Sequence, residues 1–308
     1  MDLRQLASLV AVADHRTFSA AAKSLFTVQS NISAHVARLE RELGVTLVDR
    51  GQGTLTEAGQ VVVSRSRRIQ AELDALRADV ASLGAEVAGD VRLGVIPTTA
   101  RWLLPRVVVA LQARHPKVRL VVTSATTTSL LPQLESGALD AAVLALPVDD
   151  PELGVIPLFD EDLVLVTPAG HPLADRLEVT LAEVAEHRLL LQAPGTALRN
   201  AIDVAAARSG VRLCATAEID GVRLIASLVL DGHGAGIVPY TTLPTNLALA
   251  RVITIRDLPK RQVGVVRRRG VQLSTPSHVV LDILQEVLRT GPAVPGVHLH
   301  GTDAPVAS

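Results

Sequence analysis

The chain has a single cysteine, Cys214, among its 308 residues. One cysteine excludes an intramolecular disulfide framework and is typical of proteins from a reducing cytosol. No apolar run reaches the roughly 18 residues of a membrane-spanning helix. Residues 1–15 lack the charged segment that precedes the apolar part of a signal peptide. We therefore expect a cytoplasmic protein that has no contact with a membrane.

Aromatic residues and net charge are scarce as well. Aromatics make up 2% of the sequence, so the cores must consist mainly of Val, Leu, Ile and Ala. With 48% hydrophobic and 20% charged residues the chain is typical of globular proteins and long enough for two or three domains. A formal net charge of −1 gives no overall attraction to nucleic acid. DNA binding would need locally concentrated basic groups and the affinity that dimerisation adds.

Residues 17–43 have the pattern of two short helices joined by a tight turn. Thr17 can cap the first helix, and Ala20, Ala21 and Ala22 allow another helix to approach closely. Apolar residues recur in the second helix at intervals of four, three and four, which predicts one buried stripe: Ile32, Val36, Leu39 and Leu43.

The opposite face of this second helix begins with short, uncharged side chains: Gln29, Ser30, Ser33 and Ala34. Gln can pair with adenine through two hydrogen bonds, and Ser can bond to any base edge. The face therefore predicts a recognition helix for the DNA major groove. The alternative is an ordinary helical hairpin with a polar outer face.

The flanking segments predict a winged helix-turn-helix. Leu3, Leu6, Val10 and Ala13 follow a helical period before the pair. After it, residues 45–55 alternate apolar residues with Gly51 and Gly53, which predicts a small hairpin with Arg50 near its tip.

A long helix should follow, capped by Thr56. Apolar residues recur at alternating intervals of four and three from Ile69 through Leu73, Leu76, Val80, Leu83 and Val87, and Val62, seven residues before Ile69, extends the series. This is a heptad seam on a helix of about 30 residues, roughly 45 Å long, and so narrow a stripe requires a partner helix. The same helix of a second subunit is the simplest partner. The alternative is that the stripe packs on the chain's own C-terminal domain.

From Gly89 and Asp90 onward, apolar strands alternate with amphipathic helices. The expected strands cover residues 91–97, 118–124 and 140–146 in a first half, and 163–168, 188–192, 213–219 and 236–239 in a second half. Continuous apolar strands between helices predict parallel sheets covered on both faces. Residues 291–308, rich in Pro, Gly and Ala without a period, are expected to be disordered.

The order of these parts resembles the LysR-type transcriptional regulators from about residue 2 to residue 290. The residues that carry the resemblance are Ala21, Ala22, Leu25, Gln29, Ser33, Leu39, Glu40, Leu43, Gly44, Arg50 and the run Leu55-Thr56-Glu57-Ala58-Gly59, with looser matches at His171-Pro172-Leu173, Pro194-Gly195 and Gly232 to Pro239. The resemblance implies an α/β chain with an N-terminal all-α winged helix-turn-helix, a dimerising linker helix and a two-lobed effector domain like a periplasmic binding protein. The implied boundaries are residues 1–58, 59–88 and 89–290, followed by the tail.

Such regulators are usually dimers or dimers of dimers that read promoter DNA, respond to a small metabolite and act on RNA polymerase. This chain departs from the family at Val28, where many members have Ser, and we expect Thr27 to cap the recognition helix instead. Ser30 and Ala34 stand where many members have Pro and a basic residue. Base contacts are then expected from Gln29, Ser30 and Ser33, and phosphate contacts from Lys23, Arg38 and Arg50.

Ligands of doubly wound sheets bind beyond the carboxyl ends of strands. Hydroxyl groups follow three of the expected strands, at Thr98 and Thr99, at Thr126, Thr127 and Thr128, and at Thr196 together with Arg199. Backbone amides, hydroxyls and an Arg would suit an anionic or carboxylate-bearing effector between the two lobes. The alternative is that each Thr merely caps a helix.

We find no catalytic or metal-binding spacing in the sequence. The histidines are scattered, the Gly232–Gly236 segment lacks the full dinucleotide pattern, and no nucleophile elbow is present. Cys214 lies in an apolar strand and is expected to be inert core. We therefore expect a regulator without enzymatic activity or cofactor. The competing interpretation is an α/β small-molecule-binding or catalytic protein with a helical appendage.

Overall fold

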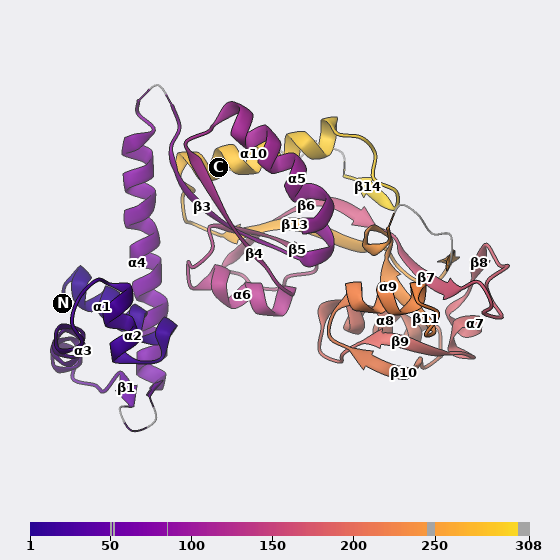
Figure 1. Cartoon of the computed structure of the whole chain (residues 1–308), viewed down its shortest axis with the longest axis horizontal. Helices are drawn as coiled ribbons and strands as arrows, with labels where there is room; N and C mark the ends of the chain where they lie inside the picture. The colour runs from indigo at the N-terminus through magenta and orange to yellow at the C-terminus, as the bar shows by residue number, and fades with distance from the viewer. Residues whose placement is uncertain (50, 52, 85, 245–249, 301–308) are drawn as a thin grey trace.

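The computed structural model describes residues 1–49, 51, 53–84, 86–244 and 250–300. Figure 1 shows an N-terminal helical domain at the lower end of an upright helix, then one α/β lobe, then a second lobe farthest from the N-terminus. No helix in these ranges is long and apolar enough to cross a membrane.

The N-terminal domain is a three-helix unit with a small hairpin. Its elements are α1 (Leu3–His15), α2 (Phe18–Ser24), α3 (Gln29–Leu43), β1 (Val48–Asp49) and β2 (Thr54–Leu55). Thr17 caps α2 as expected, since its side chain accepts a hydrogen bond from the amide of Ala20. Arg50, expected at the tip of the wing, lies outside the described residues.

Two expectations for α3 are wrong. Val28, not Thr27, is its N-cap residue and makes no side-chain cap, because the Thr27 hydroxyl instead accepts a hydrogen bond from Asn31 Nδ2 at 3.0 Å. Ile32, Val36 and Leu39 are buried as predicted, but Leu43 is 40% exposed. Leu43 is the last residue of the helix, which turns away at Gly44.

The long helix α4 (Glu57–Ala81) begins after Thr56, whose hydroxyl accepts from the amide of Gly59 and donates to the carbonyl of Thr46. It ends at Ala81, earlier than the heptad pattern predicts. Ser82 then bonds to the backbone of Ala88, and Val87 joins the core of the first lobe instead of extending the stripe.

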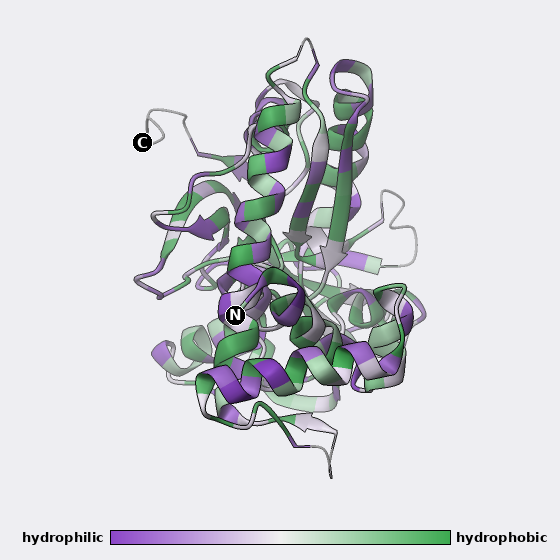
Figure 2. Cartoon of the chain, turned by 90° about the vertical axis from the view of Figure 1, so that its left-hand side faces the viewer, coloured by the Kyte–Doolittle hydropathy of each residue, from purple (hydrophilic) through white to green (hydrophobic). Residues whose placement is uncertain are grey.

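Much of the expected stripe of α4 is exposed, although Leu73 is half-buried and Val62 packs against the core of the N-terminal domain. Leu76 is 60% exposed and Val80 61%, and Ile69 and Leu83 are exposed as well. Figure 2 looks onto this side of the molecule, where apolar segments recur along α4. A different face of α4 contacts the first lobe, through an ion pair of Asp74 with Arg92 at 3.2 Å and a bond from Arg68 to the carbonyl of Glu135.

Lobe I combines an early and a late part of the chain. Its sheet has the order β14-β6-β13-β5-β3-β4. The strands are β3 (Gly89–Val95), β4 (Val118–Ser124), β5 (Ala141–Ala145), β6 (Leu153–Glu161), β13 (Arg261–Arg268) and β14 (Val297–Leu299). Helices α5 (Pro97–Arg114) and α10 (Thr275–Thr290) lie on one side and α6 (Thr127–Glu135) on the other (Figure 1).

Lobe II is built from the intervening segment. Its sheet has the order β10-β9-β11-β7-β12-β8. The elements are β7 (Leu163–Pro168), β8 (Glu178–Val179), α7 (Leu181–Ala185), β9 (Arg188–Gln192), α8 (Ala197–Arg208), β10 (Cys214–Ile219), α9 (Val222–Leu230), β11 (Ala235–Pro239), the 3₁₀ turn η1 (Tyr240–Thr242) and β12 (Ala250–Ile255). Each lobe has its own hydrophobic core.

Both sheets are mixed, which corrects the expectation of parallel sheets. The chain leaves lobe I along β6 and returns along β13, and these two strands pair antiparallel with each other. In lobe II, β7 likewise runs antiparallel to β11 and β12. Only β3, β4 and β5 of lobe I, and β9, β10 and β11 of lobe II, form the expected parallel groups, with β8 parallel to β12.

The tail is not disordered over its first part. Val297–Leu299 forms β14 against β6, and His298 and His300 bond to Asp162 and Asp160. Composition does not reveal this pairing, because the partner strand lies well over a hundred residues earlier. Residues 301–308 lie outside the described residues.

Candidate functional site

The first candidate surface is the outer face of α3. Its residues Ser30, Ala34 and Arg38 recur every four positions and are all exposed, as is Gln29, whereas Ser33 is half-buried. Lys23 is exposed on the neighbouring helix α2. The structure therefore brings together the predicted DNA contacts of α2 and α3.

Hydrogen bonds that the sequence did not reveal hold this face in place. Ser8 Oγ of α1 lies 2.9 Å from His35 Nδ1 of α3. Glu40 accepts hydrogen bonds from the amides of Leu47 and Val48, at 2.8 and 3.2 Å, and so ties α3 to the wing. His35 and Glu40 occupy polar positions of the helix pattern, where periodicity alone cannot distinguish a structural polar residue from a solvated one.

Charge in the N-terminal domain is balanced overall but not locally. The basic residues of positions 1–58 are Arg4, Arg16, Lys23, Arg38, Arg41 and Arg50, and the acidic ones are as many: Asp2, Asp14, Glu40, Glu42, Asp49 and Glu57. Several of the acids have partners away from the α3 face, for example Glu42 with the N-terminal ammonium and Asp14 with Arg67. Within the described part of the chain, Lys23 and Arg38 have no ion-pair partner.

Arg67 and Arg68, on the first half of α4, form ion pairs within the protein. Arg67 pairs with Asp14 of α1, and Arg68 pairs with Glu152 at 3.1 Å. Their side chains connect α4 to the helical domain and to lobe I. We therefore do not count them among the phosphate contacts.

The second candidate site lies where α5 and α6 begin, at the carboxyl edge of the lobe I sheet. Thr98, Thr99 and Thr127 are buried there, Thr126 is half-buried, and Thr128 is exposed. Neither α5 nor α6 has a side-chain cap at its first turn. The structure thus brings together the hydroxyls that the sequence placed after the first two strands.

These hydroxyls differ in whether they already have a partner. Thr127 Oγ1 accepts from the amide of Ala145 at 3.2 Å, so it has a structural task. Thr126 Oγ1 lies 3.2 Å from Thr128 Oγ1 and 3.0 Å from Ser129 Oγ. Within the described ranges, Thr99 Oγ1 is buried without a hydrogen-bond partner, as is Trp102 Nε1 one turn further along α5. Buried polar groups are normally paired, so two unpaired groups on one helix face are candidate ligand contacts.

The lobe II side of this region is the turn η1, which packs on α5. Arg101 Nη1 of α5 donates to the carbonyl of Thr242 at 3.2 Å, and Thr242 Oγ1 is buried with no hydrogen-bond partner among the residues that the structure describes. Hydroxyls that have no hydrogen-bond partner among the described residues therefore occur on both α5 and η1, the two elements that are in contact.

A buried ion pair, missed by the sequence analysis, lies beside this contact. Glu161 ends β6 and Arg261 begins β13, so they sit on the two strands that cross between the lobes. Glu161 is fully buried and Arg261 8% exposed, and Arg261 Nε donates to Glu161 Oε2 at 3.0 Å. Arg261 also donates to Thr98 Oγ1 at 2.7 Å, while Thr241 of η1 donates to Glu161. The pair thereby joins α5 of lobe I to η1.

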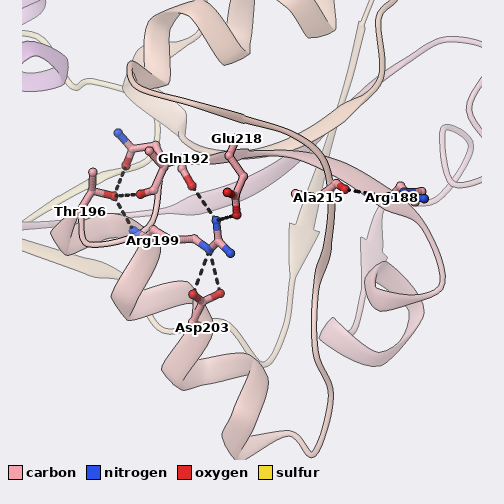
Figure 3. Close-up of polar contacts among 8 residues, drawn as sticks. Arg188, Gln192, Thr196, Arg199, Asp203, Ala215 and Glu218 are labelled. Atoms are coloured by element: carbon pink, nitrogen blue, oxygen red, sulfur yellow. Dashed lines mark hydrogen bonds and ion pairs between the residues drawn. The ribbon is translucent and has the colours of Figure 1, made fainter.

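Arg199 does not have the free charge that the sequence suggested. Figure 3 shows its guanidinium between Asp203 and Glu218, with a further bond to the carbonyl of Gln192. These bonds to two carboxylates leave little charge for an anionic ligand. Thr196 caps α8, because its hydroxyl accepts a hydrogen bond from the amide of Arg199. For Thr196 the alternative of a plain helix cap is therefore correct.

Cys214 is not part of a hydrophobic core, and the expectation that it is inert core is therefore wrong. It begins β10, the edge strand of lobe II, and its side chain is exposed. Among the described residues, no group of histidine, cysteine and carboxylate side chains could hold a metal ion.

Comparison with known proteins matches both halves of the chain. The family model of the bacterial regulatory helix-turn-helix protein, lysR family, matches residues 3–60, and that of the LysR substrate binding domain matches residues 84–289.

Individual relatives match along nearly the whole chain. A probable hydrogen peroxide-inducible genes activator of Streptomyces viridosporus is 34% identical, covering 94% of this chain and 95% of that protein. The DNA-binding transcriptional dual regulator OxyR of Escherichia coli (strain K12) is 32% identical, covering 89% and 91%. The solved structure of a full-length OxyR variant from Pseudomonas aeruginosa superposes with a TM-score of 0.76 at 24% identity and covers 99% of each chain.

Proposed function

Since the chain belongs to the LysR family of bacterial helix-turn-helix regulators, we propose that it binds promoter DNA as a dimer or tetramer and responds to a small anionic effector between its lobes. The exposed face of α3, with Gln29 and Ser30 beside the unpaired charges of Lys23 and Arg38, supports the DNA-binding part most directly. The protein would act in the cytoplasm, on DNA and RNA polymerase, without enzymatic activity or a cofactor.

The effector part rests on the contact between α5 and η1. Thr99, Trp102 and Thr242 offer buried donors without a protein partner, and the first turns of α5 and α6 are uncapped. A carboxylate could accept from these donors and from helix amides. Binding that favours one arrangement of the lobes would shift the population of that arrangement. Because α4 is attached to lobe I, the shift would reach the DNA-binding domains.

A salt-dependent gel shift of the full-length protein on its own upstream DNA tests the DNA-binding part. Competition with random duplex should leave a discrete complex preferred by about a thousandfold or more. Gln29→Ala should reduce this preference, because it removes a base contact. Arg38→Ala should weaken promoter and random DNA alike and lower the salt slope by about one. Retardation that is indifferent to sequence would contradict the proposal.

The effector part is tested with a panel of small aliphatic and aromatic carboxylates as probes, by thermal shift and by gel shift. Thr99→Val, which removes only an unpaired hydroxyl, should abolish any carboxylate response and leave promoter binding intact. Thr127→Val would be a poorer test, because it also removes the bond to the Ala145 amide. An unchanged carboxylate response in Thr99→Val would exclude the α5–η1 contact as the effector site.

A second candidate signal is hydrogen peroxide, because the relatives are named for it. Cysteine-based peroxide sensing within one chain usually ends in a disulfide, which needs a second cysteine. Here only the exposed Cys214 is available. Peroxide could therefore act only through a sulfenic acid or a disulfide to another molecule, and the anionic effector is the better-supported signal.

A further inference from the structure

The turn between α2 and α3 carries an apolar patch that the fold does not use. The patch consists of Leu25, Phe26 and Val28, which are 41%, 99% and 59% exposed. Phe26 is one of only three phenylalanines in the chain. The other two, Phe18 and Phe159, are half-buried and fully buried.

Phe26 is unfavourable for the folded monomer in two ways. Its φ of 52° lies in the left-handed region, which is uncommon for a bulky residue and which Gly or Asn adopts more easily. Its ring gains nothing from burial, because almost all of it remains in contact with water. A residue that is costly in the free protein calls for a partner that covers it.

The position of the patch identifies that partner. Val28 directly precedes Gln29, the first residue of α3, so the patch continues the proposed DNA-binding face at its leading end. Helix-turn-helix proteins insert the N-terminal residues of the recognition helix into the major groove. The preceding residues must then approach the same groove. Lys23, exposed and unpaired on the other side of Phe26, is suited to the adjacent phosphates.

The major groove offers one apolar group on the base edges, the C5-methyl of thymine. The N-terminal domain has as many acidic as basic residues, so its affinity has to draw more on uncharged contacts than that of a basic domain. We propose that Phe26, supported by Val28, packs against a thymine methyl in the operator and so contributes to sequence specificity. This inference rests on the proposed DNA-binding function.

The experiment uses the full-length protein and its promoter DNA, with binding measured by gel shift and stability by thermal denaturation. Phe26→Asn removes the ring and suits the left-handed backbone, so it should bind the promoter about tenfold more weakly while its melting temperature stays equal or rises. Phe26→Leu keeps an apolar side chain and should retain most of the affinity. Leu177→Asn, on a residue 89% exposed in lobe II, is the matched control and should change neither quantity.

Replacing single operator thymines by deoxyuridine removes the methyl alone. One such position should reproduce the loss in the wild-type protein and cost nothing further in Phe26→Asn. Wild-type affinity in Phe26→Asn would overturn the proposal. A loss of affinity that no deoxyuridine substitution reproduces would also overturn it, since the ring would then contact deoxyribose. A loss of self-association with unchanged DNA binding would overturn it as well. If the wild-type protein itself shows no preference for its promoter, the proposed function fails and not this inference alone.

Discussion

The buried ion pair of Glu161 and Arg261 fixes the positions of side chains at the contact between the lobes. Both charges are removed from water, and each compensates the other within the contact between the lobes. The desolvation cost of such a pair is large, so it is not by itself a source of stability. Its role is to fix where Thr98 and Thr241 lie, because both hydroxyls bond to it.

Glu161→Gln should destabilise the protein by about 3–5 kcal/mol, because it leaves the Arg261 charge buried without compensation. Urea denaturation measures the loss. The double variant Glu161→Leu with Arg261→Met removes both charges and should recover most of the stability, although the lobes would lose their polar connection. A double variant as unstable as the single one would show that the hydrogen bonds to Thr98 and Thr241 matter more than the charges.

Among the elements, the turn that follows β7 should make lobe II sensitive to acid. Burial, and secondarily the nearby His187 ring, lower the pKa of His171 from its ordinary value of 6.5. Its Nδ1 accepts from the amide of Leu173 at 3.2 Å, a bond that protonation of Nδ1 would break. The folded state therefore binds the proton less readily than the unfolded state.

Because the folded pKa is lowered, this contribution to stability is fully present above about pH 6.5, the unfolded value, and is lost as the pH falls from there through the lower folded pKa. The melting temperature of the wild type should fall between about pH 7.5 and 5.5, an interval that spans the ordinary histidine pKa. His171→Asn retains an acceptor and cannot titrate, so its melting temperature should fall less over the same interval. Parallel curves for the two proteins would count against this assignment.

The helix α4 has two faces with different tasks. One face is attached to lobe I through Asp74 and Arg68, and the other carries the exposed apolar stripe. An apolar heptad stripe in water requires a second helix, so the exposed stripe should be the dimer contact.

Leu76→Asp together with Val80→Asp should shift the protein toward the monomer and reduce promoter affinity by an order of magnitude or more, because two linked recognition helices bind better than one. Analytical ultracentrifugation measures the first effect and gel shift the second. Arg77→Gln, next to the stripe on the same helix, is the control, because it adds no negative charge beside Asp74, which pairs with Arg77 at 3.3 Å. Equal dimer content in all three proteins would place the dimer contact elsewhere.

At the scale of the whole molecule, the connections run from one end to the other. Arg67 joins α4 to the helical domain, Arg68 and Asp74 join α4 to lobe I, and Glu161 with Arg261 connects lobe I to η1. These contacts attach each part of the chain to the next.

The single exposed cysteine permits a prediction for the whole protein. Treatment with hydrogen peroxide should leave promoter binding of both the wild type and Cys214→Ser unchanged, because Cys214 has no second cysteine in the chain and lies at the edge strand β10 of lobe II, outside the DNA-binding domain. Gel shift before and after treatment measures this. A peroxide response that Cys214→Ser abolishes would make Cys214 the sensor and replace the anionic effector as the signal.

Features with a local period could be predicted from the sequence. The caps at Thr17 and Thr56, the buried side of α3, the exposed stripe of α4 and the alternation of strands and helices all depend on residues a few positions apart. The hydroxyls after β3 and β4 were found for the same reason, since each directly follows its strand.

Tertiary structure decided the features that arise where segments distant in the sequence come into contact. The pairing of β13 with β6 makes the sheet mixed and brings Arg261 to Glu161, and β14 orders a tail whose composition suggests disorder. Side-chain exposure is equally a property of the fold, and it separates the buried Phe159 from the exposed Phe26 and places Cys214 on an open edge. By itself the sequence determined the helices of the N-terminal domain and most strands of the parallel groups, because periodicity is local, whereas β6, β12 and β14 were not expected. Only the folded chain decided which side chains are paired, because a partner's distance in space is not encoded by its distance along the chain.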